Sequence, residues 1–403
     1  MKFAHLADCH IGAYGRDVKL KDVNKKYFIK AVDIIIEEVV DFVLIAGDLF
    51  NTAVPGIDSV KLVVSQLKRL KDKGMPVYFI AGSHDFSPSG KTMLDVLEHA
   101  DLGINVAKGD VVEDDRLKLK IVKDLKTGVG ITGMVGKRGS LEKSFYHNLY
   151  TKHFNDFDGF KIFLFHSALN ELKPKALANM ESFPVSLLPK GFDYYAGGHV
   201  HIVDQASIDG YNIVFPGPIF PNTFYELETL KKGGFFIIED GKSRFIELNE
   251  FPVHSFCIDC KNKAPSEVEE ELKRLVSGKS FEDAIITLRL KGELISGRPS
   301  DINLNEIVSL FYDAGAYAVL KNTSALCSKG FQSINVDARD VVDVEKAVIE
   351  QHSEQNSFED KTTKDIMKAL SAEKLEGEKN LDYERRLFAD VDNVLDDVVV
   401  KEE

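Results

Sequence analysis

Five short groups of carboxylate and histidine residues recur through the first half of the 403-residue chain. Each group follows an apolar run, such as Phe42–Ala46 or Val77–Ala81, of the kind that forms a buried strand. The carboxyl ends of parallel strands converge on one edge of a sheet, so we expect the five groups to meet there. In chain order the groups are Asp8-Cys9-His10, Gly47-Asp48, Gly82-Ser83-His84-Asp85, Phe165-His166 and Gly198-His199-Val200-His201.

Each group is a weak signal when it is taken alone. An aspartate after a strand often caps a helix, and a single histidine is more often a satisfied core residue than a ligand. The ordered set is more specific, because it uses five of the chain's 11 histidines and places each group at a strand end. Buried carboxylates and imidazoles also need partners that offset the cost of desolvation. The set therefore predicts a metal site.

The residue types also indicate which metal and which reaction. Mixed nitrogen and oxygen ligands suit Mn²⁺ well, whereas imidazoles discriminate against Ca²⁺ and Mg²⁺. Two such cations about 3.5–4 Å apart can activate a hydroxide and stabilise both the attacking and the leaving oxygen of a phosphoester. We interpret the cluster as a two-metal phosphoesterase centre.

The first 250 residues alternate between strands and helices. Apolar residues at helical spacing predict helices over Asp22–Val39 and Ile57–Lys73, and shorter strands follow from about residue 106. Parallel strands with helices, followed by antiparallel strands, imply an α/β fold in which two sheets pack face to face with helices outside.

The pattern restarts near residue 251 and changes again near residue 337. Residues 251–336 read as a small α/β unit, and residues 337–403 as a helical tail in which no strand is convincing. Leu387, Val391 and Val394 share one helical face in this tail. That face either packs on the rest of the chain or binds a partner.

Charge and composition limit the functional classes. The net charge is −13, but residues 337–403 hold 20 acidic and 10 basic residues, a balance of −10, so the first 336 residues carry only −3. The acidic tail favours a protein partner or solvation over nucleic acid, and the overall charge neither supports nor excludes DNA binding. Neither a membrane span nor a secretory signal is visible, so we expect a cytoplasmic protein with reduced cysteines. A zinc or redox role for Cys257 and Cys260 is the weaker alternative.

The motifs resemble those of the calcineurin-like metallophosphoesterases. Within them, the chain resembles the DNA double-strand-break repair nucleases of the meiotic-recombination-eleven (SbcD) type. Protein phosphatases of the superfamily carry an arginine in the second motif, where this chain has Leu-Phe-Asn-Thr after Asp48. The resemblance rests on His5–Gly12, Gly47–Phe50, Gly82–Asp85 and Gly198–His201, with Leu290–Leu294 and Asn322–Ala325 similar to a capping domain and 376–385 to an ATPase-binding tail.

This resemblance implies a role for each residue of the site. One metal would be held by Asp8, His10, Asp48 and His201, and the other by Asp48, Ser83, His166 and His199. His84 would contact the phosphate and help the leaving oxygen depart. Asp85 either orients His84 or is a solvent-exposed capping residue.

Two positions depart from the family pattern. Ser83 stands where the family usually has a ligating asparagine, so we expect weaker binding of the second metal. Asn51 stands where the family often has a histidine that positions the phosphate, which would affect exonuclease efficiency. Tyr14, Arg16, Lys137 and Arg138 could hold a DNA backbone, although a solvated surface charge is the alternative for each basic residue. Since no base-reading motif is present, binding without sequence preference is expected.

The leading hypothesis is thus an Mn²⁺-dependent DNA nuclease with two Mn²⁺ per chain, acting as a 3′-to-5′ exonuclease and single-strand endonuclease on DNA ends. By resemblance it would form a homodimer through helices near Ile57–Lys73 and Thr92–His99. It would also bind a coiled-coil ABC-type ATPase (Rad-fifty or SbcC type) through residues after about 340, and associate with the nucleoid. The alternatives are a phosphodiesterase for nucleotides or small molecules, and a DNA-end scaffold with a weakened site.

Overall fold

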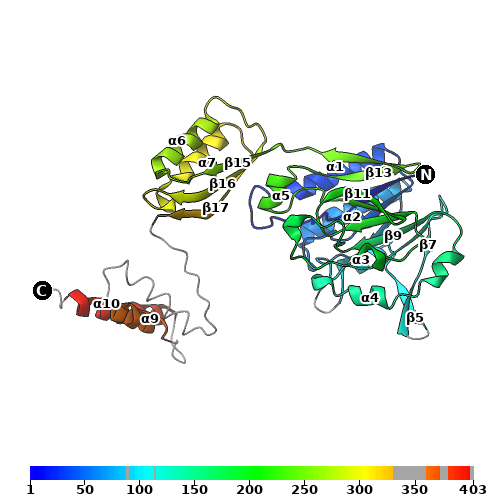
Figure 1. Ribbon diagram of the computed structural model, residues 1–403, viewed down its shortest axis with the longest axis horizontal. Coiled ribbons are helices and arrows are strands. Elements are labelled where there is room, and N and C mark those ends of the chain that lie inside the picture. Colours follow the sequence, from blue (N-terminus) through cyan, green and yellow to red (C-terminus); the bar gives the residue numbers. More distant parts are fainter. Residues whose placement is uncertain (88–89, 113–114, 330–359, 373–379, 400–403) are drawn as a thin grey trace. The chain divides into compact units, whose positions relative to one another are not determined.

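The computed structural model describes residues 1–87, 90–112, 115–329, 360–372 and 380–399 (Figure 1). The chain forms two compact units, Met1–Cys327 and Ser328–Glu403. Residues 330–359 lie outside the described residues, and with them the expected boundary at 336. The division into 1–250, 251–336 and 337–403 therefore stays a prediction.

The first sheet has the strand order β14-β13-β1-β2-β3-β4. Its four parallel strands are β1 (Lys2–Leu6), β2 (Phe42–Ala46), β3 (Val77–Ile80) and β4 (Ile104–Asn105). The antiparallel hairpin of β13 (Gly233–Glu239) and β14 (Lys242–Leu248) joins β1 at the other side. The apolar runs expected to be buried strands are thus confirmed.

The second sheet has the order β11-β12-β10-β9-β8-β7. Its central strands β8, β9, β10 and β12 are parallel, and an edge strand pairs antiparallel with β12 and another with β8. The strands are β7 (Val122–Lys123), β8 (Gly130–Gly133), β9 (Lys161–His166), β10 (Tyr194–Gly198), β11 (Val203–Ile208) and β12 (Tyr211–Pro216).

The two sheets face each other across a shared apolar core. Phe42 and Leu44 of the first sheet pack in one buried cluster with Ile162, Leu164 and Tyr194 of the second. A polar link crosses the same core, because Tyr194 Oη lies 2.9 Å from Nδ1 of the buried His5. The predicted two-sheet sandwich is therefore confirmed.

Helices cover the outer faces of the sandwich (Figure 1). On the first sheet lie α1 (Val23–Glu37), α2 (Ile57–Asp72) and α3 (Met93–His99), which bury apolar residues at helical spacing against it. The helix α1 ends two residues before the predicted Val39, which has a φ of +51° that no helix continues. Over the second sheet lie α4 (Lys143–His147) and the 3₁₀ turns Lys152–Asp156 and Val185–Leu187. A further 3₁₀ turn spans Lys175–Leu177.

A smaller α/β domain completes the first unit, and we call it the capping domain. Its sheet has the order β15-β16-β17, formed by Val253–Asp259, Ile285–Leu294 and Ala318–Ser328. The helices α6 (Pro265–Val276) and α7 (Leu304–Asp313) pack on this sheet around Val268, Ile307 and Phe311. The remaining elements of this unit are the ribbon β5 (Gly109–Val112) and β6 (Arg116–Leu119), the helix α5 (Phe224–Thr229) and the 3₁₀ turns Arg138–Ser140 and Pro299–Asp301.

The second unit contains the helices α9 (Asp360–Leu370) and α10 (Asn380–Val399), as the tail pattern predicted. Tyr383 Oη donates a hydrogen bond to the Ala372 carbonyl, which links α10 to the end of α9. Within the described parts of the chain, every helix is too short or too polar to cross a bilayer.

The core between the sheets predicts the effect of a truncation. Leu164 is 0% exposed, so Leu164→Ala should lower the free energy of unfolding by about 2–5 kcal/mol through lost burial and a cavity. Leu125→Ala is the matched control, since Leu125 is 99% exposed and its loss should cost no more than about 0.5 kcal/mol. Urea denaturation followed by circular dichroism measures both, and equal effects would contradict this packing.

Candidate metal centre

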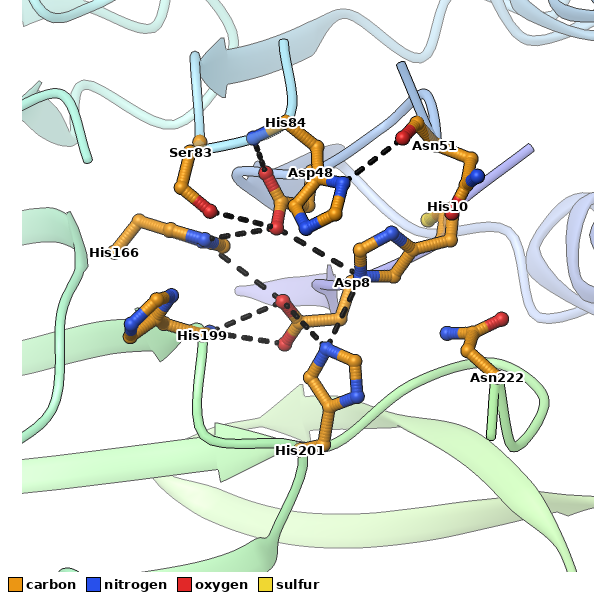
Figure 2. Close-up of polar contacts among 12 residues, drawn as sticks. Asp8, His10, Asp48, Asn51, Ser83, His84, His166, His199, His201 and Asn222 are labelled. Carbon is orange, nitrogen blue, oxygen red and sulfur yellow. Dashed lines mark hydrogen bonds and ion pairs between the residues drawn. The ribbon is translucent and has the colours of Figure 1, made fainter. Parts of the chain in front are cut away.

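The predicted ligand groups all lie at the carboxyl ends of parallel strands. Asp8 and His10 follow β1, Asp48 follows β2, and Ser83 and His84 follow β3. From the second sheet, His166 is the last residue of β9 and pairs with Gly198, the last residue of β10. His199 and His201 come directly after β10. The side chains from both sheets therefore meet at one edge of the sandwich (Figure 2).

The backbone at this edge is held in an unusual conformation. Five of the site residues have positive φ angles: 51° at Asp8, 45° at His10, 51° at Asp48, 96° at His199 and 49° at His201. Residues with a Cβ rarely adopt this region, at a cost on the order of 1–3 kcal/mol each, and such strain concentrates at functional sites. The strand-end pattern gave no sign of this feature.

One group of potential ligands consists of Asp8, His10 and His201. Nε2 of His10 lies 3.0 Å from Nε2 of His201, and the latter lies 3.6 Å from Asp8 Oδ1. Two imidazole nitrogens that bind the same cation, each at about 2.1 Å and with a right angle between the two bonds, lie about 3.0 Å apart. The spacing of the two rings therefore fits a shared ion.

A second group consists of Asp48, His166 and His199. Nε2 of His166 lies 3.1 Å from Asp48 Oδ2, and Ser83 Oγ donates a hydrogen bond of 3.4 Å to the same oxygen. His10 Nε2 of the first group is also only 3.7 Å from Asp48 Oδ2. Asp48 thus belongs to the second group and also lies close to His10 of the first, which is the position expected for a bridging ligand (Figure 2).

Partners on the far side of three rings fix their orientation. Nδ1 of His166 lies 2.9 Å from the Ala46 carbonyl, and Nδ1 of His84 lies 2.8 Å from the Asn51 carbonyl. Nδ1 of His201 lies 3.1 Å from Glu226 Oε1. A proton held on Nδ1 leaves Nε2 unprotonated and able to bind a metal. The buried Nε2 of His166 faces the Asp48 carboxylate at 3.1 Å, as a nitrogen that shares an ion with this carboxylate would.

Two glycines make room for this packing. A Cβ on Gly82 would lie 2.3 Å from Asp48 Oδ1, and one on Gly47 would lie 2.2 Å from Nδ1 of His166. Gly47 also has a φ of +87°, which favours glycine by itself. The glycines of the second and third motifs are therefore required by the close approach of the candidate ligands.

The electrostatics of the cluster show a demand for positive charge. Burial alone would lower the pKa of His166, but the attraction and hydrogen bond of Asp48 raise it to about 10. For His201, burial is likewise outweighed by Asp8 and Glu226, which raise its pKa to about 9. Burial would raise the pKa of Asp48, yet His166 holds it well below its usual range. Protons on these two imidazoles thus compensate the buried negative charge in part, at positions where cations would supply more positive charge.

The expectation for Asp85 needs a correction. Asp85 is buried, so the solvent-exposed alternative is wrong. Its carboxylate accepts hydrogen bonds from the backbone amides of Leu49, Phe50 and Gly82, and not from the His84 ring. Burial, and then the charge of Asp48, raise the pKa of this carboxyl to about 7. Asp85 therefore ties the loop after β2 to the loop after β3.

The predicted DNA contacts lie in different environments. Arg138 Nε donates a hydrogen bond of 3.3 Å to the Ser83 carbonyl, which places this guanidinium beside the candidate ligands. Lys137 Nζ lies 4.4 Å above the Phe145 ring, and Arg16 is exposed. Tyr14 Oη donates to the Pro221 carbonyl at 3.1 Å, and burial raises its pKa, so this hydroxyl faces the protein.

Comparison with known proteins gives a consistent result. Residues 1–203 match the calcineurin-like phosphoesterase family. Three similar relatives are all archaeal proteins named DNA double-strand break repair protein Mre11. The relative from Archaeoglobus fulgidus is 26% identical, with 72% of this chain and 68% of the relative covered. The relative from Methanococcus maripaludis is 29% identical over 69% of this chain and 75% of its own length.

The third relative, from Sulfurisphaera tokodaii, is 32% identical over 52% of this chain and 51% of its own length. The family match covers half of the chain and includes all seven candidate ligands, from Asp8 to His201. Members of this family depend on divalent metal ions, and the groups of candidate ligands around Asp8 and Asp48 suit such ions. By its sequence, its two-sheet fold and its ligand groups, this chain belongs to the calcineurin-like phosphoesterases.

Proposed function

We propose that the protein is a two-metal DNA nuclease that processes DNA ends in double-strand-break repair. The observation that carries the proposal is the pair of ligand groups that meet at Asp48. The relatives named for double-strand break repair support DNA as the substrate. They cover up to 72% of this chain, which is more than the residues 1–203 that match the phosphoesterase family.

We assign the metal ligands residue by residue. Asp8, His10 and His201 would hold one ion, His166, His199 and Ser83 the other, and Asp48 would bridge them. Mn²⁺ fits this mixture of imidazole and carboxylate ligands better than Mg²⁺. When bound, two such ions activate a water and stabilise the charge that develops on the phosphate oxygens.

His84 is the proposed contact to the scissile phosphate. Its backbone amide donates to Asp48 Oδ1 at 2.7 Å, and its ring Nδ1 is fixed by the Asn51 carbonyl. When the ring carries a second proton, on Nε2, this nitrogen can donate it to a phosphate oxygen or to the leaving 3′ oxygen. The ring also lies close enough to His10 and Asp48 to act as a ligand, so its role needs a direct test.

Activities and partners follow from the same proposal. We propose 3′-to-5′ exonuclease and single-strand endonuclease activity, in a protein that acts on DNA in the cytoplasm. Ile57 of α2 and Val96 of α3 are exposed apolar residues, which supports these helices as a homodimer interface. Phe388 of α10 is exposed as well, which supports the tail as the binding segment for a coiled-coil ABC-type ATPase.

A DNA-end scaffold is the second candidate, and Ser83 favours it. The Ser83 hydroxyl reaches Asp48 at 3.4 Å but is a neutral and short ligand, so the second ion has a weak protein partner there. Under this alternative the protein binds DNA ends and cuts them slowly. A small-molecule phosphodiesterase would instead cleave model diesters without competition from DNA.

One cleavage experiment tests the proposal. The full chain is mixed with end-labelled duplex DNA and Mn²⁺, with and without EDTA. We expect cutting that requires Mn²⁺, and a loss of more than about 100-fold in His84→Ala, because a positioned proton donor contributes that much. The metal content of this variant should stay at the wild-type level. Unchanged cutting by His84→Ala would remove this role, and cutting that persists in EDTA would refute a metal nuclease.

Ser83 gives a second prediction. Ser83→Asn supplies an amide oxygen of longer reach, so we expect the affinity for the second Mn²⁺ to rise about tenfold or more. Ser83→Ala, which removes the hydroxyl without adding a ligand, is the matched control and should weaken that ion. Isothermal titration calorimetry measures both variants. Identical isotherms for serine, asparagine and alanine would exclude residue 83 from the coordination sphere.

The raised pKa values predict how metal binding depends on pH. In the ion-free protein His166 and His201, with pKa values of about 10 and about 9, stay protonated at pH 8. A metal ligand must be deprotonated, so the affinity for Mn²⁺ should rise with pH until these values are passed. At pH 8, about two protons should be released per chain, measured calorimetrically in buffers of different ionisation enthalpy. Heats that do not depend on the buffer would contradict this account.

A further inference from the structure

The short helix α5 connects the candidate metal centre to the capping domain. It contains only the residues Phe224–Thr229, and it carries two carboxylates, Glu226 and Glu228, with different partners. A helix of this length has little stability of its own, so its contacts determine where it sits.

Glu226 is the contact of α5 with the metal centre. Its Oε1 lies 3.1 Å from Nδ1 of His201, and its Oε2 accepts a hydrogen bond of 2.8 Å from the Asn222 amide. The carboxylate thereby holds the His201 ring with Nε2 toward Asp8 and His10. Carboxylates in this position fix the orientation of a metal-binding imidazole and increase its basicity.

Glu228 is the contact of α5 with the capping domain. Arg289, in the middle of β16, donates to Glu228 Oε1 through Nε at 2.8 Å and to Oε2 through Nη2 at 2.7 Å. The guanidinium also lies 5.0 Å from the centre of the Phe224 ring. Both partners of this pair are largely shielded from solvent, which makes a two-pronged arginine contact stronger than an exposed one.

We infer that Arg289 is a positioning residue for the metal ligand His201, and that it acts through α5. Arg289 holds the helix by Glu228 and Phe224, and the helix in turn presents Glu226 to His201. A change in the capping domain at β16 is then transmitted to one ligand of the metal centre. The inference rests on the proposed two-metal function, because His201 matters here as a metal ligand.

A purely structural role is the competing explanation. Leu227 of α5 is fully buried, so the helix also has an apolar anchor, and the Arg289 contact could serve only to attach the capping domain. The two explanations differ in what they predict for metal affinity. An attachment that is weakened lowers the melting temperature alone, whereas a positioning residue also alters binding of the ion at His201.

The experiment compares Arg289→Ala with Arg274→Ala in the full chain. Arg274 is the matched control, since it pairs with Glu270 on the exposed face of α6, within the capping domain. Mn²⁺ binding is measured by calorimetry, and turnover by hydrolysis of bis(p-nitrophenyl) phosphate, a diester too small to need DNA contacts from the capping domain. We expect Arg289→Ala to weaken one of the two Mn²⁺ ions about tenfold and to lower turnover. Arg274→Ala should leave both unchanged.

Two further variants keep the inference testable if Arg289→Ala folds poorly. Glu228→Gln removes the charge without a change in size and should weaken the same ion. Arg289→Lys keeps the positive charge but loses the two parallel hydrogen bonds of the guanidinium, so it should retain the wild-type Mn²⁺ affinity only in part. Wild-type Mn²⁺ affinity in Arg289→Ala or Glu228→Gln, with or without a lower melting temperature, would overturn the inference.

The same data separate this inference from the proposed function. If the wild-type chain binds fewer than two Mn²⁺ ions or leaves the model diester intact, the proposed function fails. If the wild-type chain binds two Mn²⁺ ions and hydrolyses the diester, while Arg289→Ala behaves like Arg274→Ala, only the proposed role of Arg289 fails.

Discussion

The burial of two carboxylates at one point is the constraint on which this structure depends. Asp8 and Asp48 are both almost inaccessible to solvent, and both lie within 4 Å of the His166 ring. Negative charge in such a place requires compensation, because desolvation costs far more than a surface location. Protons on His166 and His201 provide it in the absence of cations. The same positions suit divalent ions, so the buried carboxylates that require positive charge are also the residues that could hold a metal centre.

The fold meets this constraint by placing the ends of two sheets together. Parallel strands from the two sheets deliver their following loops to one edge, and the apolar core between the sheets holds that edge fixed. Asp8, Asp48 and His201 have positive φ angles, so the backbone of these loops turns in a way that directs their side chains into the cluster. Strain of this kind persists only where the surrounding structure is stable, as the packed core is here.

Much of this arrangement could be predicted from the sequence. Apolar runs followed by His or Asp led to the candidate ligands, since the ends of parallel strands must converge, and the two-sheet fold followed from the same runs. The roles of Asp85 and Glu226 could not be predicted. Besides the nearby Gly82 amide, the Asp85 carboxylate accepts hydrogen bonds from Leu49 and Phe50 of another loop, which the sequence around Asp85 does not reveal. Glu226 reaches His201 only through the placement of α5, a tertiary effect that no local spacing encodes.

Anomalous diffraction from crystals of the protein soaked in Mn²⁺ tests the central claim most directly. The account predicts two manganese peaks about 3.5–4 Å apart, with the Asp48 carboxylate between them and His201 and His166 on opposite sides. A single peak, or peaks distant from Asp48, would contradict it.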